Sequence, residues 1–156
     1  MKDLIKALKE KKLTIASVES LTGGLFASEI VNCAGASDVY LGSIISYANI
    51  VKQDLLNIDK QIIEKYGVVS KEVAMLMAKN GSLLLKSDVT VSFTGNAGPN
   101  TLENKDVGIV HTCIKIHDKY FDYCDKLSGS RNKIRQEIIN LVKSRLIELL
   151  KEEGEL

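Results

Sequence analysis

Apolar residues recur every three or four positions in several segments of the chain, which is the spacing of an amphipathic helix. Leu4, Ile5 and Leu8 give one apolar face to a helix over residues 2–12. The same spacing predicts further helices over residues 22–32, 49–57, 59–66, 70–87 and 130–153. Asn49 and Ser70 are residue types favoured at the N-cap, so we expect each of them to begin its helix.

Between these helices lie short segments rich in β-branched and aromatic residues, which indicate strands. They cover residues 13–19, 39–47, 88–93, 107–117 and 119–127. The last two alternate across a short turn and predict an antiparallel hairpin. If the turn is Asp118–Lys119, Cys113 and Cys124 lie directly opposite each other. Early strands that alternate with helices, followed by a hairpin and a closing helix, predict a three-layer α/β/α sandwich with a mixed sheet.

The composition is that of an ordinary globular protein, because 45% of the residues are hydrophobic and 26% are charged. A length of 156 residues fits a single domain over residues 1–156. The net charge of +1 gives no electrostatic reason to expect a nucleic acid or an anionic membrane as partner.

The remaining bulk features concern location and metals. The first twelve residues lack the apolar core of a signal peptide, and no apolar stretch is long enough to cross a bilayer, so we expect a cytoplasmic protein. The three cysteines have unrelated spacings and no zinc pattern, and we expect them to be reduced. His111 and His117 lie too far apart along one strand to hold one ion with Cys113, so no metal is expected.

Unusual polar sequences follow three of the predicted strands. They read ESLTGG after the first, SYANIVKQ after the second and TGNAGPN after the third. Ligands in sheets of this kind gather at the carboxyl ends of parallel strands. The three strand ends together therefore predict one binding site.

Ser20, at the first of these strand ends, has two interpretations. It can be a nucleophile, with the backbone N–H groups of Thr22, Gly23 and Gly24 and the following helix N-terminus stabilising an oxyanion or a phosphate. Alternatively it is a helix cap and the glycines serve close packing, since serine is common at caps. If Ser20 is the nucleophile, Thr22 takes the capping role.

A serine nucleophile needs a base, and neither histidine lies near Ser20 in the predicted fold. A lysine can accept the proton when its pKa is lowered, as in Ser–Lys variants of the catalytic triad. Lys52 follows the second strand end by one helical turn and can reach back over it, with Tyr47 relaying a proton or orienting the pair. The alternative is that Lys52 is one of many solvated lysines.

Arg131 and Arg135 lie four residues apart near the start of the last predicted helix, after Ser128, Gly129 and Ser130. Two arginines on one face beside a helix N-terminus suit a phosphate. The alternative is that both arginines are simply solvated.

Taken together, these motifs resemble the C-terminal domain of the CinA (competence/damage-inducible) family, whose stand-alone members include bacterial nicotinamide mononucleotide deamidases of the PncC type. The resemblance runs from about residue 4 to 150. It is carried by the following motifs: ESLTGG (19–24), AGAS (34–37), SYANIVKQ (46–53), YGVVSKEVA (66–74), TGNAGP (94–99), VG (107–108) and SGSRNKIR (128–135).

The resemblance implies a serine amidohydrolase that converts nicotinamide mononucleotide to nicotinate mononucleotide and ammonia through an acyl-enzyme, with no metal or organic cofactor and as a homo-oligomer. It implies Ser20 as nucleophile and Tyr47 and Lys52 as its activating partners. The substrate-binding residues that it implies are Thr22, Gly23, Gly24, Asn49, Thr94, Gly95, Arg131 and Arg135.

The third motif departs from the family pattern. Asn96 stands where the family has isoleucine, Asn-Thr-Leu stands at residues 100–102 where it has glycines, and Asp106 replaces a proline. A loop poor in glycine approaches a ligand less closely. The altered loop therefore leaves open a non-catalytic nucleotide-binding or regulatory module. The name of the family leaves open a protein-interaction role linked to competence or recombination.

Overall fold

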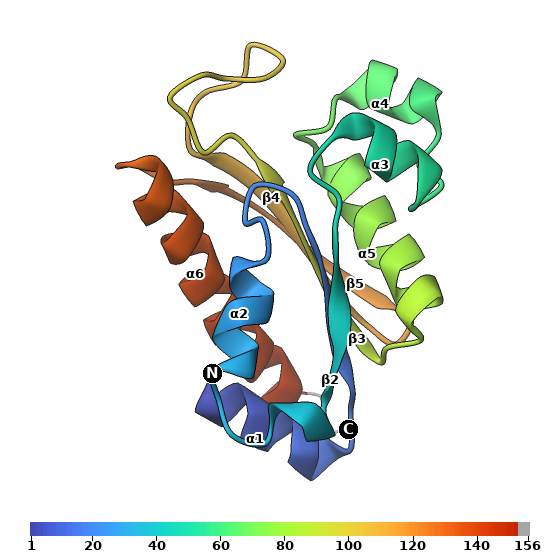
Figure 1. Cartoon of the computed structure of the whole chain (residues 1–156), viewed down its shortest axis with the longest axis vertical. Coiled ribbons are helices and arrows are strands. Elements are labelled where there is room, and N and C mark those ends of the chain that lie inside the picture. Colours follow the sequence, from blue (N-terminus) through green and yellow to red (C-terminus); the bar gives the residue numbers. More distant parts are fainter. Residues whose placement is uncertain (153–156) are drawn as a thin grey trace.

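The computed structural model describes residues 1–152, in which a five-stranded sheet lies between two layers of helices (Figure 1). Its helices are α1 (Lys2–Lys11), α2 (Leu25–Val31), α3 (Asn49–Asp54), α4 (Lys60–Tyr66), α5 (Lys71–Leu85) and α6 (Arg131–Glu152), with a short 3-10 turn at Ala36–Asp38. Its strands are β1 (Ile15–Glu19), β2 (Tyr40–Ile45), β3 (Val89–Gly95), β4 (Ile109–Ile116) and β5 (Lys119–Lys126). The predicted three-layer α/β/α fold with a mixed sheet is confirmed, and residue 153 of the last predicted helix lies outside the described residues.

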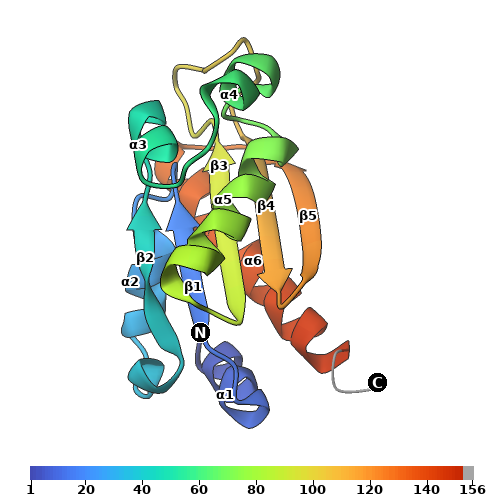
Figure 2. The same ribbon diagram turned by 90° about the vertical axis from the view of Figure 1, so that its right-hand side faces the viewer.

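The strand order is β2-β1-β3-β4-β5, and it places three parallel strands beside an antiparallel hairpin. β1 pairs in parallel with β2 and β3, while β4 runs antiparallel to both β3 and β5. The carboxyl ends of β1, β2 and β3 therefore meet at one edge of the sheet (Figure 2). This is the edge at which the three polar motifs follow their strands.

Both faces of the sheet are covered by apolar side chains. On one face, α1, α2 and α6 share the larger core, which includes Leu8, Phe26 and Ile138. On the other face, Val73 and Met77 of α5 pack with residues of α4 and the segment before it. Every residue of β1 is buried, as expected for a parallel strand inside a covered sheet.

The ends of the helices show where local sequence decides the structure. The Ser70 hydroxyl accepts a hydrogen bond from the Val73 amide at 3.2 Å, which confirms Ser70 as the N-cap of α5. The prediction for Asn49 is wrong: Ala48 holds the N-cap position of α3, and Asn49 is the first helical residue.

The hairpin forms as predicted, but its turn lies one residue earlier. Ile116 pairs with Lys119, so the turn is His117–Asp118, and His117 adopts a positive φ of 50°. Cys113 is therefore opposite Asp122, and Cys124 is opposite His111. The two cysteines are not cross-strand neighbours, and both are free thiols. No helix in residues 1–152 has the length and apolar character to cross a membrane.

Candidate active site

A pocket of about 430 Å³ opens at the edge where β1, β2 and β3 end. Each of the three polar motifs contributes to its wall, and the start of α6 closes it. The lining residues are Ser20, Leu21, Tyr47, Ala48, Asn49, Gly95, Asn96, Ala97, Gly98, Asn100, Leu102 and Arg131. The predicted convergence of the three strand ends thus gives a real cavity.

Ser20 and Lys52 meet at this edge. The Lys52 Nζ lies 3.0 Å from the Ser20 Oγ, and only 1% of Lys52 is exposed. Ser20 follows β1 directly and is held by its amide, which donates to the Phe93 carbonyl at 3.0 Å. Lys52 lies one turn into α3, and this places its side chain back over the strand ends. The sequence interpretation in which Lys52 is a solvated lysine does not fit this burial.

The groups in hydrogen-bond contact with the Lys52 amine are uncharged. Besides Ser20 Oγ, its Nζ contacts the backbone carbonyls of Ser46 at 2.5 Å and Tyr47 at 3.4 Å. A neutral amine can donate to both carbonyls and still offer its lone pair to the serine hydroxyl. Burial lowers the pKa of Lys52 to about 8, against a smaller opposing effect of the Glu103 carboxylate, which raises it. A lysine with such a pKa can act as a base near neutral pH.

Tyr47 lines the pocket, but its hydroxyl accepts a hydrogen bond from Arg131 and makes none to Ser20 or Lys52. Arg131 donates from Nη2 to the Tyr47 hydroxyl at 2.9 Å and from Nη1 to the Gly98 carbonyl at 2.6 Å. The guanidinium therefore joins the second and third strand ends across the pocket. Tyr47 reaches the Ser–Lys pair only through its backbone carbonyl, so a proton relay through its hydroxyl has no support in this geometry.

The glycine turn after Ser20 is organised by Glu19, a residue whose role the sequence did not reveal. Glu19 is fully buried, and its carboxylate accepts hydrogen bonds from the amides of Gly24 (3.2 Å), Phe26 (3.0 Å) and Ala27 (3.1 Å). It therefore caps α2 from the preceding strand and also complements the positive end of the helix dipole. The turn itself requires glycine, since Gly23 and Gly24 have positive φ values of 55° and 97°.

This capping changes what the turn can offer a ligand. The Gly24 amide donates to Glu19 and the Gly23 amide to the Ser20 carbonyl, so neither is free for an oxyanion. Thr22 is not the cap of α2, because Gly24 holds that position and the buried Thr22 hydroxyl has no hydrogen-bond partner in residues 1–152. Leu21 follows Ser20 and lines the pocket, and its amide makes no hydrogen bond within the described chain.

Hydroxyl groups of β1 and β2 form a hydrogen-bond network with the Glu19 carboxylate. Ser17 donates to its Oε2 at 3.2 Å, and Ser43 lies 3.5 Å from the same oxygen. Ser43 also contacts Ser17 and the Tyr40 hydroxyl, the latter at 2.6 Å. The carboxylate is thus fixed by groups from β1 and β2 while it holds α2, which explains why a buried acid stands directly before the candidate nucleophile.

The two arginines of the last helix have different surroundings. Arg135 donates from Nε to the Leu21 carbonyl at 2.9 Å and from Nη2 to the Thr22 carbonyl at 2.8 Å, and it does not line the pocket. It therefore braces the turn after Ser20 from outside. Arg131 is the arginine that faces the cavity.

The third strand end contributes Gly95 to the pocket but not Thr94. The Thr94 hydroxyl donates to the Val68 carbonyl at 2.7 Å, away from the cavity lining. Asn49 lines the pocket from the start of α3. Of the predicted substrate-binding residues, the structure brings Asn49, Gly95 and Arg131 to the cavity. Its lining does not include Thr22, Gly23, Gly24, Thr94 or Arg135.

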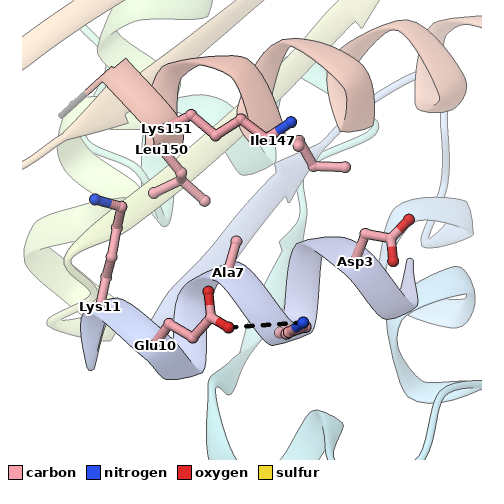
Figure 3. A pocket seen from close by; sticks show the side chains of 8 residues that line it. Asp3, Ala7, Glu10, Lys11, Ile147, Leu150 and Lys151 are labelled. Atoms are coloured by element: carbon pink, nitrogen blue, oxygen red, sulfur yellow. Dashed lines mark ion pairs between the residues drawn. The ribbon is translucent and has the colours of Figure 1, made fainter. Parts of the chain in front are cut away.

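A second groove, of about 460 Å³, runs between α1 and α6 (Figure 3). It lies at the opposite end of the molecule from the strand ends (Figure 1). Both lysines and acidic side chains line it, and Lys6 pairs with Glu10 at 3.8 Å. Ile147 and Leu150 form its apolar part. Its lining residues include no serine, cysteine or histidine, so Ser20 marks the better candidate site.

Residues 1–152 contain no group of three or more His, Cys, Asp or Glu side chains arranged to hold a metal ion. His111 and Cys124 are neighbours, with 3.8 Å between Nε2 and Sγ. Cys113 is buried beneath α5, and burial raises the pKa of its thiol to about 12. These residues therefore do not extend the Ser20 site.

Comparisons with known proteins agree with this architecture. A competence-damage inducible protein of Bacillus cytotoxicus is 44% identical over 138 residues, which are 86% of this chain and 33% of that protein. One from Halalkalibacterium halodurans is 41% identical over 152 residues, which are 92% of this chain and 36% of that protein. The chain spans about a third of the length of these curated relatives.

Solved structures share the fold. A CinA superfamily protein from Enterobacter cloacae matches with a TM-score of 0.93 at 21% identity, over 96% of this chain and 89% of that one. A competence/damage inducible protein from Agrobacterium tumefaciens matches with a TM-score of 0.90 at 28% identity, over 95% and 92% of the two chains. The sequence matches the family described as the CinA C-terminal domain over residues 1–150. The chain therefore belongs to the CinA C-terminal domain family.

Proposed function

We propose that this domain is a serine amidohydrolase that removes ammonia from the carboxamide of nicotinamide mononucleotide. The observation that carries the proposal is the contact of 3.0 Å between the Ser20 Oγ and the buried Lys52 amine, whose pKa burial lowers to about 8. A neutral lysine beside a serine hydroxyl is the arrangement that nucleophilic acyl transfer needs. The pocket in front of this pair gives the substrate a place to bind.

In the proposed reaction, the Ser20 Oγ attacks the carboxamide carbon while its proton passes to the Lys52 Nζ. The carbonyl oxygen becomes an oxyanion, for which the unpaired Leu21 amide is the candidate donor. When the C–N bond breaks, the Lys52 ammonium returns the proton to the leaving group, and ammonia departs. Water then attacks the acyl ester with Lys52 as base, which releases nicotinate mononucleotide and restores Ser20.

Arg131 is the proposed anchor for the phosphate of the nucleotide. Its Nη1 and Nη2 each donate to one protein group, and the guanidinium has five N–H donors, so further donors remain for an anion. The lining residues of the pocket include no acidic side chain that would repel a phosphate. Arg135 acts indirectly, by bracing the turn that carries Ser20.

The proposal is tested by ammonia release from the purified protein given nicotinamide mononucleotide. Ser20→Ala and Lys52→Met should each abolish turnover, because one removes the nucleophile and the other the base. Ser144→Ala on α6 and Lys79→Met on α5 are matched controls at exposed positions and should keep wild-type rates. Turnover that survives Ser20→Ala would refute the assignment of the nucleophile.

A non-catalytic nucleotide-binding module remains the second candidate, and one observation favours it. The three acceptors around the Lys52 Nζ also satisfy the three N–H donors of an ammonium, a form that cannot activate Ser20. Wild-type protein that binds nicotinamide mononucleotide without releasing ammonia at any pH between 6 and 10 would support this candidate over the hydrolase.

A further inference from the structure

Leu102 is an apolar side chain held at the mouth of the Ser20 pocket. It lines the cavity, and 55% of its surface is exposed. A single exposed leucine is common on protein surfaces and has no meaning by itself. What distinguishes Leu102 is the set of buried polar contacts that fixes its backbone.

Asn96 supplies the first of these contacts. Its side chain is 97% removed from solvent, since only 3% of the residue is exposed. Its Oδ1 accepts a hydrogen bond from the Leu102 amide at 3.0 Å, and its Nδ2 donates to the Leu102 carbonyl at 3.2 Å. The same Nδ2 lies 3.2 Å from the Lys105 carbonyl. The amide side chain of Asn96 thus binds Leu102 on both sides of its Cα.

A second anchor holds the loop from its far side. The Glu103 carboxylate accepts hydrogen bonds from the amides of Val68 and Val69, ahead of α5. The Lys105 amine contacts the carbonyls of Tyr66 and Val69 and pairs with Glu103 at 3.2 Å. Residues 102–105 are therefore tied to the third strand end and to the segment before α5. These contacts hold the backbone of Leu102 where its side chain lines the cavity.

We infer that Leu102 is a specificity-determining residue that packs against the flat face of the substrate's aromatic ring, and that Asn96 is the residue that positions it. The inference rests on the proposed function, because it names the part of the nucleotide that this loop recognises. Arg131 gives the pocket its charge, while Leu102 and Ala97 give it apolar surface. Nicotinamide mononucleotide has an anionic phosphate for Arg131 and a flat pyridinium ring whose face can pack against these aliphatic side chains. A preorganised side chain contributes to affinity without a cost for ordering it.

Binding measurements separate this inference from catalysis. Calorimetric titration is carried out in the Ser20→Ala background with two probes, nicotinamide mononucleotide and ribose 5-phosphate, which lacks the ring. Leu102→Ala should raise the Kd for nicotinamide mononucleotide about tenfold, equivalent to about 1.4 kcal/mol, and leave the Kd for ribose 5-phosphate unchanged. Leu102→Met should restore most of the affinity, because it conserves the apolar volume.

Two further variants test the role of Asn96 and guard against general effects. Leu84→Ala on α5 removes a leucine that is 50% exposed and lies outside the pocket, and it should change neither Kd. Asn96→Ala should raise the Kd for nicotinamide mononucleotide as Leu102→Ala does. The double variant should raise this Kd little further, since both substitutions act through one contact. Sedimentation and thermal melting of each variant show whether assembly or folding has changed.

The possible results decide between the two claims. Wild-type turnover with no effect of Leu102→Ala on either probe overturns the inference and leaves the hydrolase. If Leu102→Ala raises the Kd for nicotinamide mononucleotide alone and the wild-type protein shows no turnover, the inference is supported and the hydrolase is overturned. Equal weakening of both probes, or a change of oligomeric state in Leu102→Ala, assigns Leu102 to another role and also overturns the inference. Failure of the Ser20→Ala protein to bind either probe overturns it as well, and wild-type turnover then tells whether the hydrolase stands.

Discussion

The rate of amide hydrolysis should depend on pH through Lys52. Only the neutral amine can accept the Ser20 proton. Burial is the main cause that lowers the pKa of Lys52 from 10.5 to about 8. Lowering the pH below 8 protonates this amine and removes the base. We therefore expect kcat/KM to fall about tenfold for each pH unit below that value.

The magnitude follows from the same pKa. With a pKa of about 8, roughly half of the Lys52 side chains are neutral at pH 8, about 9% at pH 7 and about 1% at pH 6. A lysine at the ordinary value of 10.5 would be neutral in only about 0.03% of molecules at pH 7. Burial of Lys52 thus raises the amount of active base at neutral pH by about 300-fold.

The assay is ammonia release measured from pH 6 to 10 at constant ionic strength, with substrate well below KM. Glu103→Gln should move the acid limb to lower pH, because the Glu103 carboxylate raises the pKa of Lys52 and its removal leaves desolvation unopposed. The matched control is Glu64→Gln, at an exposed acid on α4. A flat profile between pH 6 and 8, or a limb close to pH 10, would refute the assignment of Lys52 as base.

Four other outcomes can be checked by standard measurements. Lys52→Met should raise the free energy of unfolding below pH 8 by at most about 3 kcal/mol, measured in urea. Between pH 8 and 10.5 the native wild-type protein binds fewer protons than its unfolded chain, so the wild-type protein gains stability as the pH rises. The advantage of the variant should therefore shrink through that window. A variant that is less stable at pH 7 would contradict the cost of burying this charge. Glu19→Ala should lower the free energy of unfolding by about 3–5 kcal/mol, because the amides of Gly24, Phe26 and Ala27 lose a buried acceptor. An effect below 1 kcal/mol would argue against the capping role. Arg131→Gln should raise KM for nicotinamide mononucleotide at least tenfold with a smaller change in kcat; an unchanged KM would remove Arg131 as the phosphate anchor. In native protein a thiol reagent should modify Cys124 and spare Cys113, whose buried thiol has a pKa of about 12, and fast labelling of Cys113 would show that α5 does not cover it.

The sequence was sufficient to predict the fold because local signals agreed with the global arrangement. The helical periodicity of the last segment and the Ser70 cap specify their elements without long-range information. The convergence of the three strand ends followed from parallel topology alone. The same topology allowed Lys52 to reach Ser20, but it did not exclude a solvated lysine, and only the family resemblance singled Lys52 out.

The hairpin register could not be read from the same pattern. The observed pairing of Cys113 with Asp122 differs from the predicted pairing with Cys124 by two residues on the second strand. A shift of two keeps every side chain on the same face of the sheet, so the alternation of polar and apolar residues is identical in both registers. His117 lies in the turn and adopts a positive φ, and the local sequence does not predict that conformation.

Glu19 was missed for a different reason. Its hydrogen-bond donors lie at residues 17, 24, 26, 27 and 43, so only the folded chain brings them together. An acid before a glycine turn can be solvated, catalytic or capping, and the spacing alone does not separate these roles. The same applies to Asn96, whose partners Leu102 and Lys105 come from a loop without regular structure.

The position of β2 at the border of the sheet links the candidate site to local unfolding. Ser20 follows β1, which has a strand on each side, whereas Lys52 follows β2, which is paired only with β1. The ladder between Ile15–Glu19 and Tyr40–Ile45, extended by the bond from the Ser46 amide to the Glu19 carbonyl, is what keeps the two groups in contact. An edge strand can detach without the rest of the domain, so amide hydrogen exchange in β2 reports how often the nucleophile and its base are separated.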